Sequence, residues 1–271
     1  MAKTGRIRAG VGGWTFEPWR GVFYPKGLKQ AAELEYASRR LTAIEVNGTY
    51  YSTFKPESFA KWRAATPEGF RFTVKASRFC TNRRVLAGMG PSLEVFLNQG
   101  LAELGDRLGP ILWQFMGTKK FEADDFAAFL ELLPDELEGL PLRHAVEPRH
   151  DSFKTPEFVA LCRRRKVAIV LADHETYPMI PDVTADFVYA RLQTGSDEIE
   201  TAYAPKDLDV WARRLEAFAE GSAPQDLPLV AGEPGAKEPR DVYAFFIHEG
   251  KVRAPAAAMA LLERVGQAAA Q

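Results

Sequence analysis

The chain has 271 residues, a formal net charge of −1, and 46% hydrophobic and 26% charged residues. This composition is ordinary for a globular protein and allows one large domain or two small ones. The nearly balanced charge excludes a global attraction to nucleic acid or to a membrane surface, so an anion-binding site has to be local.

Short apolar runs alternate with helical patterns from one end of the chain to the other. The apolar runs predict eight strands, at residues 6–14, 42–47, 70–76, 109–115, 142–147, 167–173, 185–192 and 241–248. Apolar residues spaced by three and four predict seven helices, at residues 28–41, 56–65, 92–108, 123–133, 155–166, 205–221 and 254–270.

This alternation predicts the fold class. Strands joined by helical crossovers pair in parallel, and eight such units in about 250 residues match a closed (β/α)8 barrel of the TIM type. An open doubly wound sheet is the alternative, but Thr15 stands where the dinucleotide fingerprint needs its third glycine. We therefore expect an α/β protein with a single TIM-barrel domain over residues 1–271. Residues 221–240, rich in Pro and Gly, are expected to form a surface loop, or to contain an extra strand at 227–231.

Cysteine usage and the N-terminus bear on location. Cys80 and Cys162 have no nearby Cys or His that would complete a zinc knuckle or a redox CxxC motif. The first ten residues are basic without an apolar signal-peptide core, and no apolar run approaches the roughly 20 residues of a membrane span. We expect a cytoplasmic protein with reduced thiols and no membrane partner.

Polar residues collect at the expected carboxyl ends of the strands, which is where barrel enzymes carry their active sites. The candidate catalytic residues, which could transfer protons or add to a carbonyl, are Glu45, Lys75, Glu147 and His150. The candidate substrate-binding residues are Trp14, Trp19, Asn47, Tyr51, Arg149, Asp173 and Arg191.

Several of these residues also have a structural interpretation. Glu45 could plug the barrel through buried hydrogen bonds, and Lys75 and Glu147 could form an internal ion pair. Trp14 and Trp19 could cover the core instead of stacking on a ligand.

Three function classes fit the candidate residues. In the first, an enzyme acts on a phosphorylated or other anionic substrate: Lys75, Arg149 and Arg191 supply cations, Glu45 or Glu147 the base, and His150 or His174 the acid. Lys75 could also form a Schiff base if burial among cations lowers its pKa.

The second class is a metal-dependent isomerase or nuclease, in which Glu45, Glu147, Asp173 and His174 surround Mg²⁺ or Mn²⁺. The cations expected in the same mouth place it below the first, so no cofactor is expected and a divalent metal is the alternative. The third class is a non-catalytic protein that binds a small anion or nucleic acid.

Six segments resemble one known family. They are GGWTFEPWRGVFYPKG (12–27), TAIEVNGTYYSTF (42–54), GFRFTVKASR (69–78), RHAVEPRHDSF (143–153), DFVYARL (186–192) and VYAFFIHEGKVRAPAAAMALLERV (242–265). In this order they resemble the YecE-like family, domain of unknown function 72, bacterial and archaeal TIM-barrel proteins without a settled activity. The resemblance implies the barrel fold and highlights the same strand ends, but it implies no reaction.

The chain departs from the family pattern at three strand ends. Phe153 stands where a Trp often closes the motif after the fifth strand, and Gln193 stands where the seventh strand often ends in His. His248 and Glu249 lie where many members have paired Asn and an Asp.

For Glu147, the sequence also predicts an ionisation state and a partner. Glu147 precedes Pro148, which ends the strand. Cations outnumber acids on the adjacent strand ends, so we expect Glu147 to be ionised and paired with Lys75 or Arg149.

Overall fold

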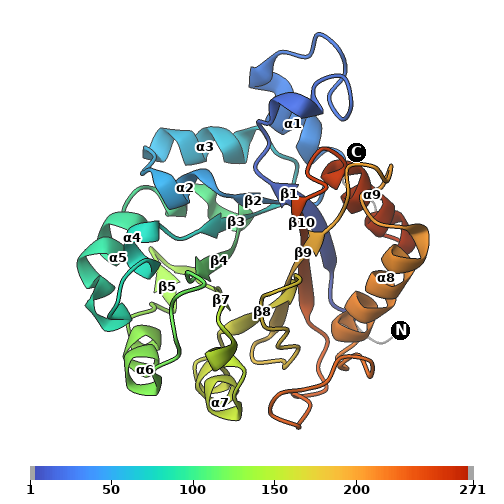
Figure 1. The fold of residues 1–271 in the computed structure, drawn as a ribbon. Helices are drawn as coiled ribbons and strands as arrows, with labels where there is room; N and C mark the ends of the chain where they lie inside the picture. The colour runs from blue at the N-terminus through green and yellow to red at the C-terminus, as the bar shows by residue number, and fades with distance from the viewer. Residues whose placement is uncertain (1–3, 268–271) are drawn as a thin grey trace.

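The computed structural model describes residues 4–267, and its centre is a closed barrel of eight parallel strands (Figure 1). The barrel strands are β1 (Ile7–Gly12), β2 (Ala43–Val46), β3 (Arg71–Lys75), β4 (Leu108–Gln114), β7 (His144–Glu147), β8 (Ala168–Asp173), β9 (Phe187–Thr194) and β10 (Asp241–Glu249). Around the barrel they follow chain order, and β10 pairs with β1 to close it. The expected α/β barrel of the TIM type is confirmed.

Helices surround the strands (Figure 1). They are α1 (Glu33–Ser38), α2 (Gly48–Tyr51), α3 (Pro56–Ala64), α4 (Arg78–Thr81), α5 (Gly90–Leu97), α6 (Ala123–Glu131), α7 (Pro156–Arg164), α8 (Pro205–Ala219) and α9 (Ala254–Arg264). Short 3-10 helices add η1 (Glu17–Trp19), η2 (Gln30–Ala32), η3 (Leu86–Met89), η4 (Leu101–Arg107) and η5 (Asp151–Phe153), and β5 (Glu136–Leu137) pairs with β6 (Leu140–Pro141) in a small antiparallel hairpin. Within residues 4–267, no helix is long and apolar enough to cross a membrane.

Three expected helices differ from the structure. The helix expected at 92–108 is broken, because Gly100 adopts a left-handed backbone with φ 111° and the chain continues as η4. A Cβ at Gly100 would lie 2.5 Å from Cα of Pro56, so only glycine fits this turn. The helix expected at 28–41 is reduced to η2 and the short α1. The closing helix ends at Arg264, and residues 268–270 lie outside the described part of the chain.

Loops take the place of a helix between β8 and β9. Residues 174–186 connect these neighbouring strands and pack against the segment 221–240, which contains no strand. The carboxylate of Asp182 joins the two segments by accepting hydrogen bonds from the backbone N–H groups of Val230 (2.7 Å) and Ala231 (2.9 Å).

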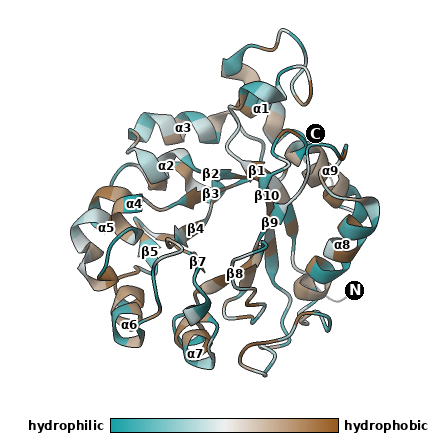
Figure 2. Ribbon diagram, in the orientation of Figure 1, coloured by the Kyte–Doolittle hydropathy of each residue, from teal (hydrophilic) through white to brown (hydrophobic). Residues whose placement is uncertain are grey.

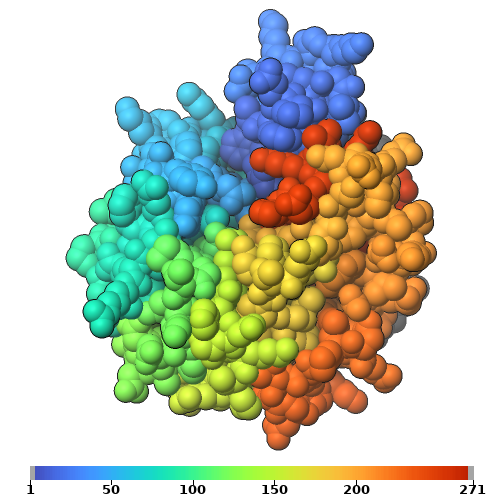
Figure 3. Space-filling model, in the orientation of Figure 1, coloured from blue at the N-terminus to red at the C-terminus, as the bar shows by residue number. Residues whose placement is uncertain are grey.

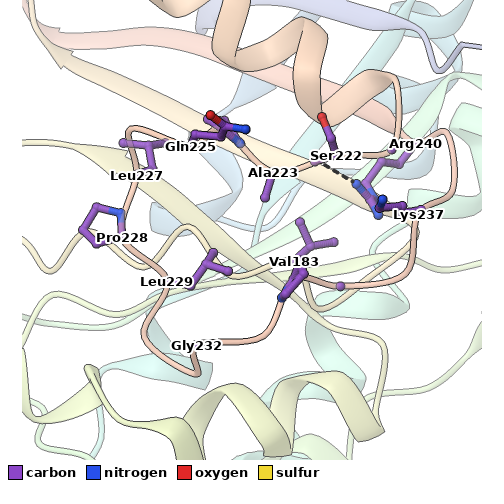
Figure 4. Close-up of a pocket in the computed structure, with 14 residues that line it drawn as sticks. Val183, Ser222, Ala223, Gln225, Leu227, Pro228, Leu229, Gly232, Lys237 and Arg240 are labelled. Atoms are coloured by element: carbon purple, nitrogen blue, oxygen red, sulfur yellow. Dashed lines mark hydrogen bonds between the residues drawn. The ribbon is translucent and has the colours of Figure 1, made fainter.

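These two loops also border a pocket of about 540 Å³ (Figure 4). Val183 of the first loop faces Ala223 and Leu229 of the second across it, and Arg240 donates to the carbonyl of Ser222 at its edge. None of the candidate site residues lines this pocket.

Strand alternation produces two apolar regions, one inside and one outside the barrel wall. The inner cluster includes Leu112, Val170, Tyr189 and Phe245, all buried, so the barrel is filled with side chains. The outer cluster lies between the strands and the helices, and helices such as α8 carry apolar and hydrophilic residues on different sides (Figure 2). The inner core gives way to charged residues at the carboxyl end of the strands.

Candidate functional site

A buried ion network closes the inner core at the carboxyl end of the barrel. Arg191 of β9 donates from Nε and Nη2 to the two carboxylate oxygens of Glu45 on β2, each at 3.1 Å. Its Nη1 donates to Oε1 of Glu147 on β7 at 2.6 Å. Glu45 and Glu147 are fully buried and Arg191 is 5% exposed. All three nitrogens of this guanidinium are therefore occupied by carboxylates of the protein.

Neutral side chains complete the network. Gln114, at the end of β4, donates to Oε2 of Glu147, and the hydroxyl of Tyr189 donates to Oε2 of Glu45 at 2.7 Å. Thr73 lies 2.9 Å from the same hydroxyl. Buried charges are tolerated when their remaining lone pairs are satisfied in this way.

The network keeps Glu147 ionised. Burial alone would raise the pKa of Glu147, but the positive charges of Arg191 and Arg149 outweigh it and hold the pKa at about 2. The expectation of a paired, ionised Glu147 agrees with this geometry, although its principal partner is Arg191 and not Lys75. Burial beside Glu45 raises the pKa of Tyr189 far above its usual range, so this phenol stays protonated.

Lys75, the last residue of β3, is the free amine beside this network. Its side chain is 7% exposed, and Nζ lies 4.1 Å from the centre of the Tyr50 ring. Among residues 4–267, no side-chain hydrogen bond or ion pair engages this Nζ. Burial, followed by the charge of Arg191, lowers the pKa of Lys75 to about 8. The backbone of Lys75 is fixed because Thr49 of α2 donates to its carbonyl at 2.7 Å.

Arg149 lies on the rim, one residue beyond the proline that ends β7. Its Nη2 reaches Glu147 at 3.4 Å, and its guanidinium lies 4.5 Å from the centre of the Tyr177 ring. Its Nε is buried without a hydrogen-bond partner among the described residues. The side chain is 21% exposed and no hydrogen bond engages its Nη1 among residues 4–267, so Nη1 is the donor that a ligand could use.

Two histidines face the same rim. The imidazole of His174 stacks on Tyr177 with a centroid distance of 3.6 Å and lies 5.8 Å from that of His248. The space-filling view shows the red segment near residue 250 beside yellow residues on one face (Figure 3). Burial and the charges of His248 and Arg149 lower the pKa of His174, which favours the neutral ring at neutral pH.

Two candidates from the sequence have contacts that fix loops. The ring of His150 accepts a hydrogen bond from the backbone N–H of Ser152 at 3.1 Å and so caps η5. Asp173 accepts from the hydroxyls of Thr194 (2.7 Å) and Tyr203 (3.0 Å), which ties β8 to β9. The geometry favours a structural role for both residues.

The tryptophans of the first loop belong to the core. Trp14 packs edge-on against Trp62 at 5.1 Å, outside the barrel wall. Trp19 is 1% exposed, and its Nε1 donates to the carbonyl of Lys251 at 2.8 Å. These contacts favour the interpretation that Trp14 and Trp19 cover the core, and they disfavour the interpretation that the two rings stack on a ligand at the mouth.

Asn47 and Tyr51 lie after β2 and differ in exposure. Asn47 is partly buried and donates weakly to the carbonyl of Glu45 at 3.4 Å. Tyr51 is 63% exposed and borders a pocket of about 620 Å³ between α2, α4 and α5. This pocket lies on the same end of the barrel as Lys75, next to the site and not inside it.

Sequence reasoning missed the aromatic partners of the two free cations. Tyr50 lies under Lys75 and Tyr177 under Arg149, yet neither was a candidate. Tyr50 follows Asn47 closely, so its position at a strand end was a usable signal. Tyr177 lies inside the helix-free connection 174–186, where no periodicity indicates which way a side chain points.

The metal-dependent alternative requires carboxylate and imidazole side chains that are free to bind a cation. Within the described residues, no group of three or more His, Cys, Asp or Glu side chains is placed to hold a metal ion. Glu45 and Glu147 would have to release Arg191 before they could bind a cation. The arrangement instead combines a poised amine, a partly free guanidinium and a neutral imidazole, which suits proton transfer or amine chemistry on an anionic molecule.

Solved structures with a similar fold cover nearly the whole chain. A DUF72 family protein from Thermotoga maritima matches with a TM-score of 0.68 and 26% identity, over 94% of this chain and 96% of that one. A DUF72 family protein from Enterococcus faecalis matches with a TM-score of 0.68 and 20% identity, over 97% and 96% of the two chains, and shows likeness of fold alone.

A curated relative and a family profile give the same assignment. The protein YecE (UPF0759) of Escherichia coli K12 is 29% identical over 134 residues, 48% of this chain and 46% of that protein, so the match spans about half of each. The profile of the family described as "Protein of unknown function DUF72" matches residues 8–271. Because this match spans nearly the whole described barrel, the chain belongs to the DUF72 family.

Proposed function

We propose that this protein is an enzyme that uses Lys75 as a base or nucleophile on a small anionic substrate at the mouth of the barrel. The observation that carries the proposal is the state of Lys75: a 7% exposed amine with a pKa of about 8 and no ion-pair partner among residues 4–267. An amine with this pKa is partly neutral at physiological pH, as a general base or a Schiff-base nucleophile must be.

The surrounding residues have distinct roles in this proposal. Arg149 binds the anionic group of the substrate, because its side chain is 21% exposed and, among residues 4–267, hydrogen bonds engage only its Nη2. His174, neutral beside it, is placed to exchange a proton with the substrate. Arg191, Glu45 and Glu147 position the site, because their opposite charges are paired and each nitrogen of the buried Arg191 guanidinium is bonded to a carboxylate.

In the amine route, the balance of atoms is simple. Neutral Lys75 adds through Nζ to a substrate carbonyl, and the resulting carbinolamine loses water to give an imine. In the base route, Nζ takes a proton from the substrate and holds it as an ammonium ion. The second route requires no carbonyl group, so the two are separable by trapping with borohydride.

Further expectations remain part of this proposal. Cys80 and Cys162 are buried and unpaired, which supports a reducing, cytoplasmic location. We also propose that the chain is one domain and that its ligand is a small phosphorylated or carboxylated molecule. A role in binding nucleic acid has no specific observation in its favour.

The test compares Lys75→Met with Lys251→Met on a panel of phosphorylated and carboxylated small molecules. Lys251 is the matched control, because it is a partly buried lysine whose Nζ lies 4.2 Å from the centre of an aromatic ring, that of Phe16, away from the network. Turnover that is lost in Lys75→Met and kept in Lys251→Met supports the proposal. Stabilisation by an anion without turnover of any panel member in the wild type favours a non-catalytic anion-binding protein.

A further inference from the structure

The opposite end of the barrel carries a second cluster of charge. Three arginines lie at the amino-terminal ends of strands that are not adjacent in the barrel: Arg8 in β1, Arg71 at the start of β3 and Arg143 just before β7. They surround the phenol of Tyr243 in β10, which is 2% exposed. In TIM barrels this end normally serves stability and carries no catalytic groups.

Acidic partners are too few for these arginines. Asp241 serves two of them, at 3.0 Å from Arg8 and 3.6 Å from Arg143. Arg143 has a second partner, the largely exposed Asp186, at 3.3 Å. Arg71 has no carboxylate within ion-pair distance among residues 4–267, and its guanidinium donates to the carbonyl of its neighbour Phe70. The cluster of three guanidiniums is therefore undercompensated.

Because these arginines are partly or fully buried, their uncompensated positive charge destabilises the fold. Arg8 is 5% exposed, and its Nε is buried without a hydrogen-bond partner in the described part of the chain. Burial and the nearby charge of Arg8 lower the pKa of Arg71. Buried cations normally require a partner for both charge and hydrogen bonding.

The cluster borders a pocket of about 270 Å³. Its walls include Arg71, Arg143, Asp241 and Tyr243, and the backbone of Gly109. Asp106 also lies at its edge, but its carboxylate is paired with Arg63 at 3.1 Å and with Arg107. The volume is at the lower limit of small-molecule sites, which restricts the ligand to a small one.

We propose that this pocket is an anion site, which binds a small oxyanion such as phosphate or a small phosphate monoester. The fork-shaped guanidiniums of Arg71 and Arg143 and the hydroxyl of Tyr243 supply convergent donors, and Arg8 supplies buried positive charge behind them. The bound anion stabilises the folded barrel by completing the charge balance of its closed end. This site is independent of the mouth, from which the filled interior of the barrel separates it.

The experiment measures binding of inorganic phosphate by calorimetry and by thermal melting, with chloride at the same ionic strength as reference. Phosphate is expected to raise the melting temperature of the wild type above its value in chloride. In Arg71→Gln the dissociation constant should rise at least about tenfold, since a charged hydrogen bond contributes about 1.5 kcal/mol or more. This variant leaves no carboxylate unpaired and should fold.

Two further variants make the result specific. Tyr243→Phe removes one hydroxyl and should weaken phosphate binding about threefold to tenfold. Arg149→Gln, at the other end of the barrel, removes the guanidinium that the proposed function assigns to the substrate's anionic group, so the phosphate binding that persists in this variant belongs to the pocket of Arg71 and Arg143.

Equal stabilisation by phosphate and chloride would overturn the proposal, and so would unchanged affinity in both Arg71→Gln and Tyr243→Phe. A response lost only in Arg149→Gln would place the anion at the mouth, which contradicts this inference and supports the proposed function.

Discussion

Arg191 joins β9 to β7 through a 2.6 Å hydrogen bond from its Nη1 to Oε1 of Glu147. The same guanidinium holds Glu45 of β2 through two further bonds, so one side chain connects three separate strands across the barrel interior. Both carboxylates are consequently fixed in place, and the pKa of Glu147 is held low. Beside them, the Nζ of Lys75 has no ion-pair or hydrogen-bond partner among residues 4–267. Arg191 thus sets the electrostatic environment of the proposed catalytic amine without being available to the substrate.

Replacing Arg191 should reveal this role. Arg191→Lys keeps one positive charge but cannot bond both oxygens of Glu45 and reach Glu147 as well, so we expect a loss of about 3–5 kcal/mol in the free energy of unfolding. Arg149→Lys is the matched control on the rim and should change this free energy by about 1 kcal/mol or less, because Arg149 reaches Glu147 only at 3.4 Å. Urea denaturation of both variants at pH 7 measures the difference. Equal losses in the free energy of unfolding would show that the buried Arg191 bridge stabilises the fold no more than the rim contact of Arg149 does.

The charge of Glu147 should stabilise the fold in a defined pH range. Its pKa is lowered from 4.5 to about 2 in the folded protein, so its stabilising contribution is complete above about pH 4.5 and is lost as the pH falls through 2. Glu147→Gln should therefore lower the free energy of unfolding by about 3–5 kcal/mol at pH 7, with a smaller difference at pH 3. Denaturation curves at several pH values provide the test. A variant as stable as the wild type at pH 7 would favour a purely functional role for this carboxylate.

Lys75 should have the opposite effect on stability. Its pKa is about 8 in the fold against 10.5 for an ordinary lysine, so between these values the unfolded chain binds more protons and stability rises with pH. Below about pH 8 the buried amine is charged, and it lowers the free energy of unfolding by its full amount. Lys75→Met should therefore be more stable than the wild type at pH 7, by roughly 1–3 kcal/mol, and this advantage should shrink towards pH 10.5. Melting curves from pH 6 to 10 measure it, and a pH-independent difference would contradict the shifted pKa.

The two cysteines should be unreactive in the folded protein. Burial raises the pKa of Cys80 to about 11 and that of Cys162 well above its usual value. At pH 8 both should remain protonated and inaccessible, so a thiol reagent such as DTNB should label neither until denaturant is added. Rapid labelling of a native thiol would show that one of these sites opens readily.

The strand-helix alternation predicted the barrel because each strand is a short apolar run and each crossover has helical spacing. The pattern also placed Glu45, Lys75, Glu147 and Arg191 near the carboxyl ends of their strands, where the structure has them. What the pattern could not show was which charges neutralise one another, since that depends on distances across the barrel. From the sequence, Arg191 was expected to bind an anionic ligand. In the structure its guanidinium is bonded to the carboxylates of Glu45 and Glu147.

Local interactions explain the remaining differences. His150 and Asp173 have the chemistry of site residues, yet each makes hydrogen bonds within its own loop or to the adjacent strand, which residue type alone does not reveal. Trp14 and Trp19 lie in a loop that folds back over the outer core, so their large rings are used for packing. Gly100 interrupts a helix whose apolar spacing continues past it, because the crossover must turn close to Pro56.

The helix-free connection between β8 and β9 has a consequence for how the barrel opens. Elsewhere a regular helix shields each crossover, but here that sector is covered by residues 174–186 and 221–240, held together through Asp182. Regular helices protect their own amides, whereas these loops contain few backbone hydrogen bonds of that kind. Amide exchange should consequently be fastest in these two segments, and a single protease cut should fall there first. The barrel would then lose its cover beside β8 while the Arg191 bridge still holds β2, β7 and β9 together.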